Sequence, residues 1–262
     1  MGSYSKSTLI DNSWAIDDPA VAEGLHDSFV RDGVVVLPGF VPPDVVQQME
    51  AECERLASKA FRSLSRSTPY LSSIRDDVPA GDPRAHEITS AVGVVAYDLV
   101  PKGDLVRQLY EDDGLLAFVA AVLGEPVLHR YADPFGALNI SVMEEGDHLG
   151  WHFDMTDFVV SLAIRASERG GEFVNAPRIR HLEDENFAGV ADVLAGQAPD
   201  RVRIEPMTPG TLMIFNGRWS MHKVSPVEGP RSRVVALLAY DRKPGTDSTD
   251  ELKLSRYGRL PA

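Results

Sequence analysis

The stretch LGWHFDMTDFVV, residues 149–160, combines an apolar, strand-like pattern with two metal-ligating side chains. His152 and Asp154 lie two positions apart within it. In an extended strand such side chains project from one face, so the imidazole and the carboxylate converge on one point. A convergent histidine and carboxylate favour a metal site.

A pair of this kind is weak evidence alone, because the chain has 7 histidines. His181 and Glu183 show a similar spacing, but they lie in an acidic loop before a predicted helix, where side chains two apart diverge. A third ligand strengthens the first pair. His222 follows an apolar strand and a glycine turn in PGTLMIFNGRWSMHKVSPV, and we expect it to enter a barrel from the side opposite His152. Two imidazoles and one carboxylate cap one face of iron and leave sites open.

Composition and charge limit the class of protein. The chain has 262 residues, of which 44% are hydrophobic and 25% charged, so we expect a single domain with a sizeable core. A net charge of -13 argues against binding to nucleic acid or to anionic membranes. The single cysteine, Cys53, permits no intrachain disulfide and is expected to be a buried thiol. The sequence has no apolar signal core and no membrane-length apolar run, so we expect a cytoplasmic protein.

The chain divides into three parts by pattern. We expect residues 1–13 to be flexible, residues 14–124 to be helix-rich and residues 125–245 to form many short strands. The polar, turn-rich segment 62–87 is expected to be a long loop. Helices are expected over 17–33, 42–61, 105–124 and 184–196, and a short strand over 34–40. Many short strands of this kind predict a sandwich or barrel.

Two arginines follow His222 at the start of a predicted strand, in GPRSRVVALLAYD. Arg231 and Arg233 share one face of it, and an arginine fork grips a carboxylate in a bidentate way. The other odd positions of that strand, Val235, Leu237 and Ala239, are apolar and predict a dry inner wall. Spacing alone does not choose between the two arginines.

With these residues the sequence resembles the iron(II)- and 2-oxoglutarate-dependent oxygenases, whose fold is a double-stranded β-helix, a cupin-like jelly roll. Longer segments look like the group that contains the free-amino-acid halogenases. They are ADPFGALNISVMEEGDHLGWHFDMTDFVVSLAI, GGEFVNAPRIR, PGTLMIFNGRWSMHKVSPVEG, VVALLAYDRKPG and the late RYGR. The resemblance therefore implies a mainly β fold with an N-terminal helical layer.

The resemblance also implies a cofactor set. His152, Asp154 and His222 would be the catalytic iron(II) ligands, with 2-oxoglutarate and O2 as cosubstrates and succinate and CO2 as products. Arg233 matches the arginine that holds the distal carboxylate of 2-oxoglutarate, with Arg231 the competing candidate. Asn139, on the predicted strand GALNISVM, is a weaker candidate for contacting the cosubstrate.

One departure from the halogenating members concerns Asp154, which stands where they have glycine. Loss of the carboxylate opens an iron site for chloride, so its presence here implies hydroxylation, desaturation or ring closure rather than chlorination. The implied substrate is a free amino acid or a small amino-acid-derived metabolite. The apolar positions at Val235, Leu237 and Ala239 favour one without a long charged side chain.

Candidate substrate residues lie near these motifs. Arg84, in the polar loop GDPRAHE, is the preferred carboxylate anchor, ahead of Arg75. Asp157 is a candidate for a substrate ammonium group, and Trp151 and Trp219 line the pocket or are simple core aromatics. Two other classes of function remain open: a non-oxidative jelly-roll metalloenzyme with zinc, and a ligand-binding module in which the triad residues satisfy one another.

Overall fold

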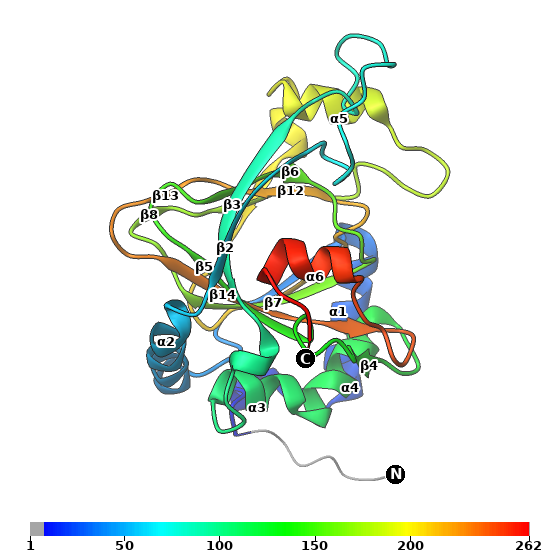
Figure 1. Ribbon diagram of the computed structural model, residues 1–262. Coiled ribbons are helices and arrows are strands. Elements are labelled where there is room, and N and C mark those ends of the chain that lie inside the picture. Colours follow the sequence, from blue (N-terminus) through cyan, green and yellow to red (C-terminus); the bar gives the residue numbers. More distant parts are fainter. Residues whose placement is uncertain (1–7, 262) are drawn as a thin grey trace.

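The computed structural model describes residues 8–261, and its largest element is an antiparallel sheet. Its strands are β1 (Val34–Leu37), β2 (Phe61–Ser67), β3 (Ile88–Val95), β5 (Leu138–Met143), β6 (His148–His152), β7 (Val159–Arg165), β9 (Phe173–Ala176), β10 (Arg203–Glu205), β11 (Leu212–Phe215), β12 (Met221–Val224) and β14 (Arg233–Leu238). Their order is β1-β11-β7-β14-β5-β3-β6-β12-β9-β10, with β2 paired to β3. In Figure 1 the strands β6 and β12 lie above β5, β14 and β7, and β3 crosses between these two layers. The predicted jelly roll is confirmed.

Two short strand pairs complete the described sheets. β8 (Arg169–Gly170) pairs with β13 (Val227–Glu228), and β4 (His129–Arg130) pairs with β15 (Tyr240–Asp241). The first pair extends the layer that holds β6 and β12 (Figure 1). The second pair joins the end of β14 to the helical part of the chain, because β15 follows β14 and β4 follows the fourth helix.

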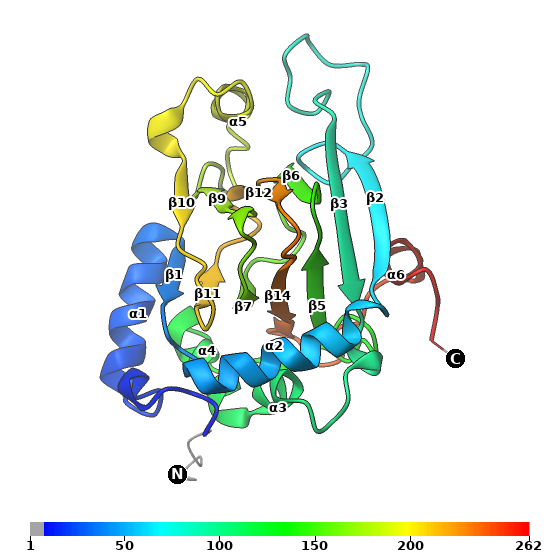
Figure 2. The same ribbon diagram turned by 90° about the vertical axis from the view of Figure 1, so that its left-hand side faces the viewer.

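The described residues form six helices, of which the first four cover one side of the sheet. They are α1 (Pro19–Asp32), α2 (Pro43–Ala57), α3 (Leu105–Glu111), α4 (Asp113–Leu123), α5 (Phe187–Leu194) and α6 (Asp250–Tyr257), with short 3-10 turns at Asn12–Trp14, Tyr97–Leu99 and Pro199–Arg201. α1 to α4 form the expected helical layer, while α5 lies at the opposite end of the molecule (Figures 1 and 2). The main hydrophobic core lies between that layer and the sheet. Within residues 8–261 no helix is long and apolar enough to cross a membrane.

The first helix begins and ends where its sequence predicts. The Asp18 side chain accepts a hydrogen bond from the Ala20 backbone N–H, and Pro19 occupies the first turn. Gly33 ends the helix with φ +72°, a left-handed conformation that favours glycine. The predicted glycine stop is confirmed.

The helix-rich part also supplies strands to the sheet. β1 pairs with β11, and β3 lies between β5 and β6 in the middle of the strand order. The expected loop over 62–87 is wrong in its first part, because β2 pairs along its length with β3. β2 has the sequence FRSLSRS and is largely exposed, so it lacks the apolar alternation that marks a half-buried strand.

Two other expectations differ from the structure. Of the segment expected to be flexible, residues 1–7 lie outside the described residues, but Ile10 is buried in the main core and Asn12–Trp14 form a 3-10 turn. The single helix expected over 105–124 is two helices. Asp112 between them is extended, and its side chain accepts a hydrogen bond from the Leu115 N–H at 2.8 Å, capping α4.

The two histidine strands are neighbours. β12 pairs with β6, and His222 lies directly opposite His152 in the register. The expectation that His222 enters from the opposite side of the barrel is therefore wrong. The order β6-β12-β9 brings residues far apart in sequence onto one wall.

Candidate active site

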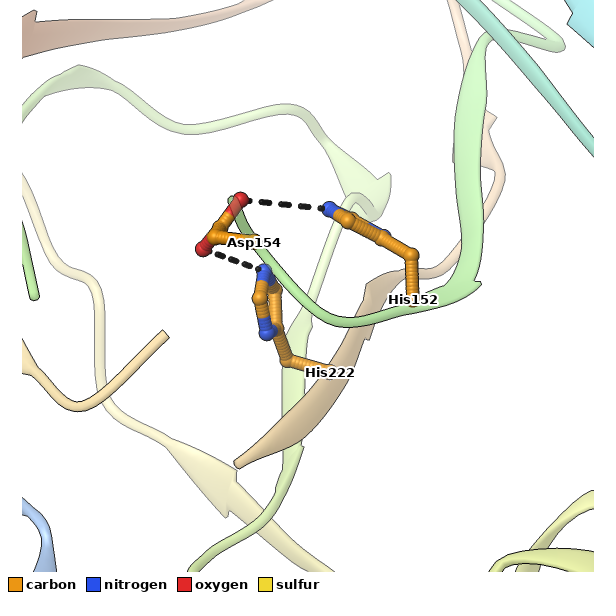
Figure 3. Close-up of side chains that lie close together, drawn as sticks. All are labelled: His152, Asp154 and His222. Atoms are coloured by element: carbon orange, nitrogen blue, oxygen red, sulfur yellow. Dashed lines mark ion pairs between the residues drawn. The ribbon is translucent and has the colours of Figure 1, made fainter. Parts of the chain in front are cut away.

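Three side chains from β6, the segment after it and β12 point toward one another (Figure 3). Asp154 Oδ1 lies 3.8 Å from His152 Nε2, and Asp154 Oδ2 lies 3.2 Å from His222 Nε2. One ligand atom of each residue lies within 4.8 Å of the others, and across residues 8–261 no other group of three such side chains meets this condition. The alternative pair at His181 and Glu183 lies in an exposed loop.

Backbone carbonyls orient both histidine rings. His152 Nδ1 lies 2.7 Å from the Gly150 oxygen, and His222 Nδ1 lies 2.9 Å from the Ser220 oxygen. A carbonyl oxygen only accepts hydrogen bonds, so each Nδ1 carries a proton and a neutral ring then presents an unprotonated Nε2. Both Nε2 lone pairs face the Asp154 carboxylate, which also only accepts. A cation bound among these atoms satisfies all three, and a carbonyl on Nδ1–H is the usual support of a metal-bound histidine.

Burial and mutual charge set the protonation of the triad. Burial, reinforced by the nearby His222, lowers the pKa of His152 to about 4. Burial by itself would raise the pKa of Asp154, but the positive charge of the histidines outweighs it and lowers this pKa to about 2. Burial lowers the pKa of His222, and the Asp154 carboxylate more than offsets this, so the net change is upward. The carboxylate therefore stays ionised and attracts a cation to the point where the histidines face it.

The backbone around Asp154 holds its carboxylate in place. The Asp154 N–H donates to the Gly217 oxygen at 3.1 Å, and the preceding Phe153 N–H donates to the Pro69 oxygen at 2.8 Å. A Cβ at Gly217 would collide with the Asp154 carboxylate, so glycine at this position is what permits the close approach. The β6–β12 register also shifts between His222 and Val224, a bulge of the kind that re-aims side chains beside active sites.

Aromatic rings enclose His222. Its ring centroid lies 5.4 Å from Phe173, 4.9 Å from Phe215 and 4.3 Å from the ring of His152. His222 is buried, whereas His152 and Asp154 are half-buried. The site is therefore closed behind His222 and open on the side of the other two residues.

The two candidate arginines have different surroundings. Arg231 precedes β14, is 51% exposed in its side chain and pairs with Glu50 at 3.1 Å. Arg233 is the first residue of β14 and is buried, and its guanidinium has one hydrogen-bond contact among the described residues, with the Met143 sulfur at 3.6 Å. Burial lowers the pKa of Arg233 to about 10. A buried guanidinium without a carboxylate partner suits an anionic ligand.

Further polar groups lie on the inner wall. Asn139 is buried opposite Leu237, but Phe135 O accepts from its Nδ2 and Tyr257 OH donates to its Oδ1. Ser161 Oγ, on β7 opposite the same Leu237, is buried without a hydrogen-bond partner. Groups of this kind call for a polar ligand or water.

Asn175 was not among the predicted site residues. It lies opposite His222 in the β12–β9 register and is fully buried, and its Oδ1 has no hydrogen-bond partner among the described residues. GGEFVNAPRIR contains it, but the strand pairing that places it beside His222 is not visible in the sequence.

The charged substrate candidates are engaged within the protein. Arg84 forms a bidentate pair with Asp82, at 2.9 and 2.7 Å, and its guanidinium lies 4.3 Å from the Phe187 ring centroid. Both carboxylate oxygens of Asp157 are taken, one by Arg218 and one by Arg242. Neither side chain is free to bind a substrate without first breaking these pairs.

Both tryptophans lie near one small apolar cluster beneath α5. The Lys223 ammonium lies 5.0 Å from the Trp151 ring, and Lys223 points away from the face of β12 that carries His222. Trp151 packs against the small apolar cluster beneath α5, which includes Val190 and Val193 of that helix. Trp219 lies 5.8 Å from the Arg180 guanidinium, next to the same cluster.

Comparison with known proteins gives a family and a fold. The chain matches the halogenase D family over residues 17–254. It resembles a 2OG-Fe(II) oxygenase family oxidoreductase from Burkholderia pseudomallei, at 17% identity and a TM-score of 0.53, over 86% of this chain and 92% of that one. It also resembles AviO1 from Streptomyces viridochromogenes Tue57, at 16% identity, TM-score 0.55, over 92% and 98% of the two chains.

A third solved structure with this fold is the non-heme alpha ketoglutarate dependent epimerase SnoN from nogalamycin biosynthesis. It is 18% identical, with a TM-score of 0.58, over 85% of this chain and 81% of that one. Identities this low show the shared fold alone. No curated protein matches the chain. The predicted resemblance to the free-amino-acid halogenase group is confirmed by the family match.

Proposed function

We propose a function on the premise that this chain belongs to the halogenase D family. The protein is an iron(II)- and 2-oxoglutarate-dependent oxygenase that hydroxylates, or otherwise oxidises at a C–H bond, a free amino acid or a small amino-acid derivative. The observation that carries the proposal is the convergence of His152, Asp154 and His222 on one point. Three protein ligands of this type leave coordination sites for a chelating cosubstrate and for oxygen.

The residues present fit both cofactors. The triad offers three acceptors that face one another without a donor between them when the rings are neutral. When bound, iron activates oxygen at the expense of 2-oxoglutarate, which is converted to succinate and CO2. Arg233 would hold the distal carboxylate of 2-oxoglutarate, and its burial would keep that ion pair away from water.

Asp154 supports hydroxylation over chlorination. Its carboxylate stands where the halogenating members of the resembled group have glycine, and its main chain is fixed by the hydrogen bond to Gly217. A carboxylate held in this way would fill the coordination position that a halide ion requires. The family name describes the chemistry of other members, and Asp154 separates this chain from them.

The surroundings of Arg233 favour an oxygenase over the two other classes of function. A zinc enzyme for isomerisation or hydrolysis has no use for a buried, unpaired arginine near the metal. A ligand-binding module in which the triad residues satisfy one another gives no role to the buried Arg233 guanidinium, which has no carboxylate partner among the described residues.

Anaerobic addition of iron(II) and 2-oxoglutarate tests the cofactor assignment. We expect the weak visible charge-transfer band of the chelate in the wild type and a weaker band in Asp154→Ala. With iron and cosubstrate in excess, a missing band in the wild type contradicts the proposal. Succinate release in the presence of single amino acids then identifies a substrate.

The mass of the product tests the reaction type. A gain of one oxygen, or a loss of two hydrogens, agrees with the proposal. A chlorinated product in the presence of chloride contradicts the role given to Asp154, and a product of unchanged mass indicates epimerisation, the reaction named for SnoN.

A further inference from the structure

A serine side chain faces the interior of the jelly roll from β7. The even-numbered residues of this strand, Val160, Leu162 and Ile164, pack into the main core between the sheet and the helices. Successive side chains of a strand alternate between its two faces. Val159 and Ser161 therefore point the other way, into the space between the two layers of the sheet.

That space lies between the triad and the buried arginine. An apolar cluster with members from both layers occupies it. Phe173 and Phe215 of this cluster enclose the ring of His222, and Met143 of the same cluster contacts the Arg233 guanidinium through its sulfur at 3.6 Å. A ligand that extends from the triad to the arginine would therefore run along this cluster.

The register of the sheet places Ser161 at the edge of the cluster. The strands β11, β7 and β14 lie side by side (Figure 2). Ser161 is directly opposite Met213, a member of the cluster, on β11 and opposite Leu237 on β14. Residues paired in this way have Cβ atoms about 5 Å apart on the same face. Leu237 also shares the inner face of β14 with Arg233, so the serine and the arginine belong to one wall.

The Ser161 hydroxyl is buried without a partner. The residue is 3% exposed, and its Oγ has no hydrogen bond to any described residue. Asn139, the predicted cosubstrate contact, lies opposite the same Leu237 on β5, but Phe135 and Tyr257 engage both ends of its amide. An unpaired buried hydroxyl is costly unless a ligand or water supplies the missing bond. Ser161 is therefore available for a ligand and Asn139 is not.

The chemistry of this wall favours an anionic ligand. A serine hydroxyl can donate one hydrogen bond, and a carboxylate only accepts them. The Arg233 guanidinium on the same wall is also buried and has no carboxylate partner among the described residues. A neutral donor beside a buried cation gives a carboxylate two sources of hydrogen bonds from adjacent strands.

The unpaired amide oxygen of Asn175 does not fit the same ligand. The Glu205 carboxylate lies 3.4 Å from Asn175 Nδ2, and because a carboxylate only accepts, this contact fixes the orientation of the amide. The atom left without a partner is Oδ1, which is itself an acceptor and would repel a carboxylate. Ser161, which can donate, matches the chemistry of the cosubstrate.

We propose that Ser161 donates a hydrogen bond to the distal carboxylate of 2-oxoglutarate, beside Arg233. The inference rests on the proposed function and deepens it by adding a residue that selects the cosubstrate. The distal end is assigned because Ser161 and Arg233 lie on the adjacent strands β7 and β14, whereas the triad belongs to β6, the segment after it and β12 of the other layer. Two buried donors at this end discriminate against a 2-oxo acid with an apolar end, which would leave both unpaired.

Anaerobic titration of the iron(II)-loaded protein tests this assignment without turnover. The charge-transfer band reports the apparent Kd of 2-oxoglutarate. The paired probe is 2-oxopentanoate, which keeps the chelating end and carries a methyl group in place of the distal carboxylate. We expect Ser161→Ala to raise the apparent Kd of 2-oxoglutarate by about 10- to 100-fold, the loss typical of a hydrogen bond to a charged group. The apparent Kd of 2-oxopentanoate stays at its wild-type value.

Thermal unfolding separates binding from folding. Without ligands, the Tm of Ser161→Ala should equal or exceed that of the wild type, because the change removes a buried group that has no partner in the protein. Thr246→Val is the matched control for loss of a hydroxyl. The Thr246 hydroxyl donates to the Asp241 carboxylate at 2.6 Å, so its removal should lower the Tm and leave the apparent Kd of 2-oxoglutarate unchanged.

The outcomes separate the two proposals. No band in the wild type overturns the proposed function itself. A normal band with an unchanged apparent Kd of 2-oxoglutarate in Ser161→Ala overturns the role of Ser161. An equal loss for 2-oxoglutarate and 2-oxopentanoate overturns the assignment to the distal carboxylate. A lower Tm of ligand-free Ser161→Ala shows that the protein itself satisfies the hydroxyl, which also overturns the proposal.

Discussion

Replacement of Arg233 by methionine is expected to make the ligand-free protein more stable and to weaken its affinity for 2-oxoglutarate. The side chain is buried, and its hydrogen-bond contact among the described residues is with a sulfur atom. A charge in such a place is costly to folding and is retained when a ligand needs it. Methionine keeps a similar length and adds a thioether next to Met143.

The size of the effect follows from the lowered pKa. Burial takes the pKa of Arg233 from 12.5 to about 10, which corresponds to roughly 3 kcal/mol against the charged form. Because the folded-state pKa is lowered, this cost is fully present below pH 10 and is relieved only as the pH rises above 10. Relaxation reduces the gain, so we expect the free energy of unfolding to rise by about 1–3 kcal/mol and Tm by about 3–10 °C.

Differential scanning calorimetry with and without 2-oxoglutarate, in the presence of iron(II), measures both effects. Wild-type Tm should rise with 2-oxoglutarate, because a ligand at about 100 times its Kd adds roughly 2.7 kcal/mol. Arg233→Met should have a higher Tm than the wild type without 2-oxoglutarate, and added 2-oxoglutarate should change this Tm little. Arg231→Met is the control: Arg231 is half exposed and paired with Glu50, so its replacement should change stability by at most about 1 kcal/mol and keep the response. A destabilised Arg233→Met protein that still responds to 2-oxoglutarate would refute the reasoning.

Three other changes probe the site and the core. Gly217→Ala should weaken iron(II) binding by about tenfold while the fold stays unchanged, because the added Cβ displaces the Asp154 carboxylate. Metal titration measures the affinity, and an unchanged affinity for iron(II) would contradict the packing argument. Asp154→Gly should lose hydroxylation activity. Mass spectrometry of the products formed in chloride or bromide should show whether a halogenated product replaces the hydroxylated one. Hydroxylation at the wild-type rate would show that the Asp154 carboxylate is dispensable. Cys53 should resist iodoacetamide at pH 8 in the native protein and react after unfolding, because burial raises the pKa of its thiol to about 12; rapid native labelling would show that α2 opens.

Strand alternation predicted the pair at His152 and Asp154, although β6 ends at His152 and Asp154 lies in the segment after it, where its N–H donates to the Gly217 oxygen. The place of His222 depends on which strands pair, and this is a property of the whole sheet. Local patterns could not show that β12 lies beside β6, so the predicted side of the barrel was wrong. The same limit hid Asn175, which acquires its position beside His222 from the β9 pairing.

Spacing could not separate the two arginines either, since positions 231 and 233 would project from the same face of one strand. The distinction arises because β14 begins at Arg233, whereas Arg231 precedes the strand and meets Glu50 of α2. For α6 the local signals were present, with Thr249 as the capping residue and Gly258 as the stop. β2 carried no such signal, because a strand exposed on both faces has no apolar side to repeat.

The charges of the site form a complementary arrangement that explains why its parts occur together. Asp154 and two histidines create a point that attracts a cation, whereas the buried guanidinium of Arg233, without a carboxylate partner among the described residues, attracts an anion. Arg233 is buried, which suits a cosubstrate that stays bound while the substrate enters and leaves.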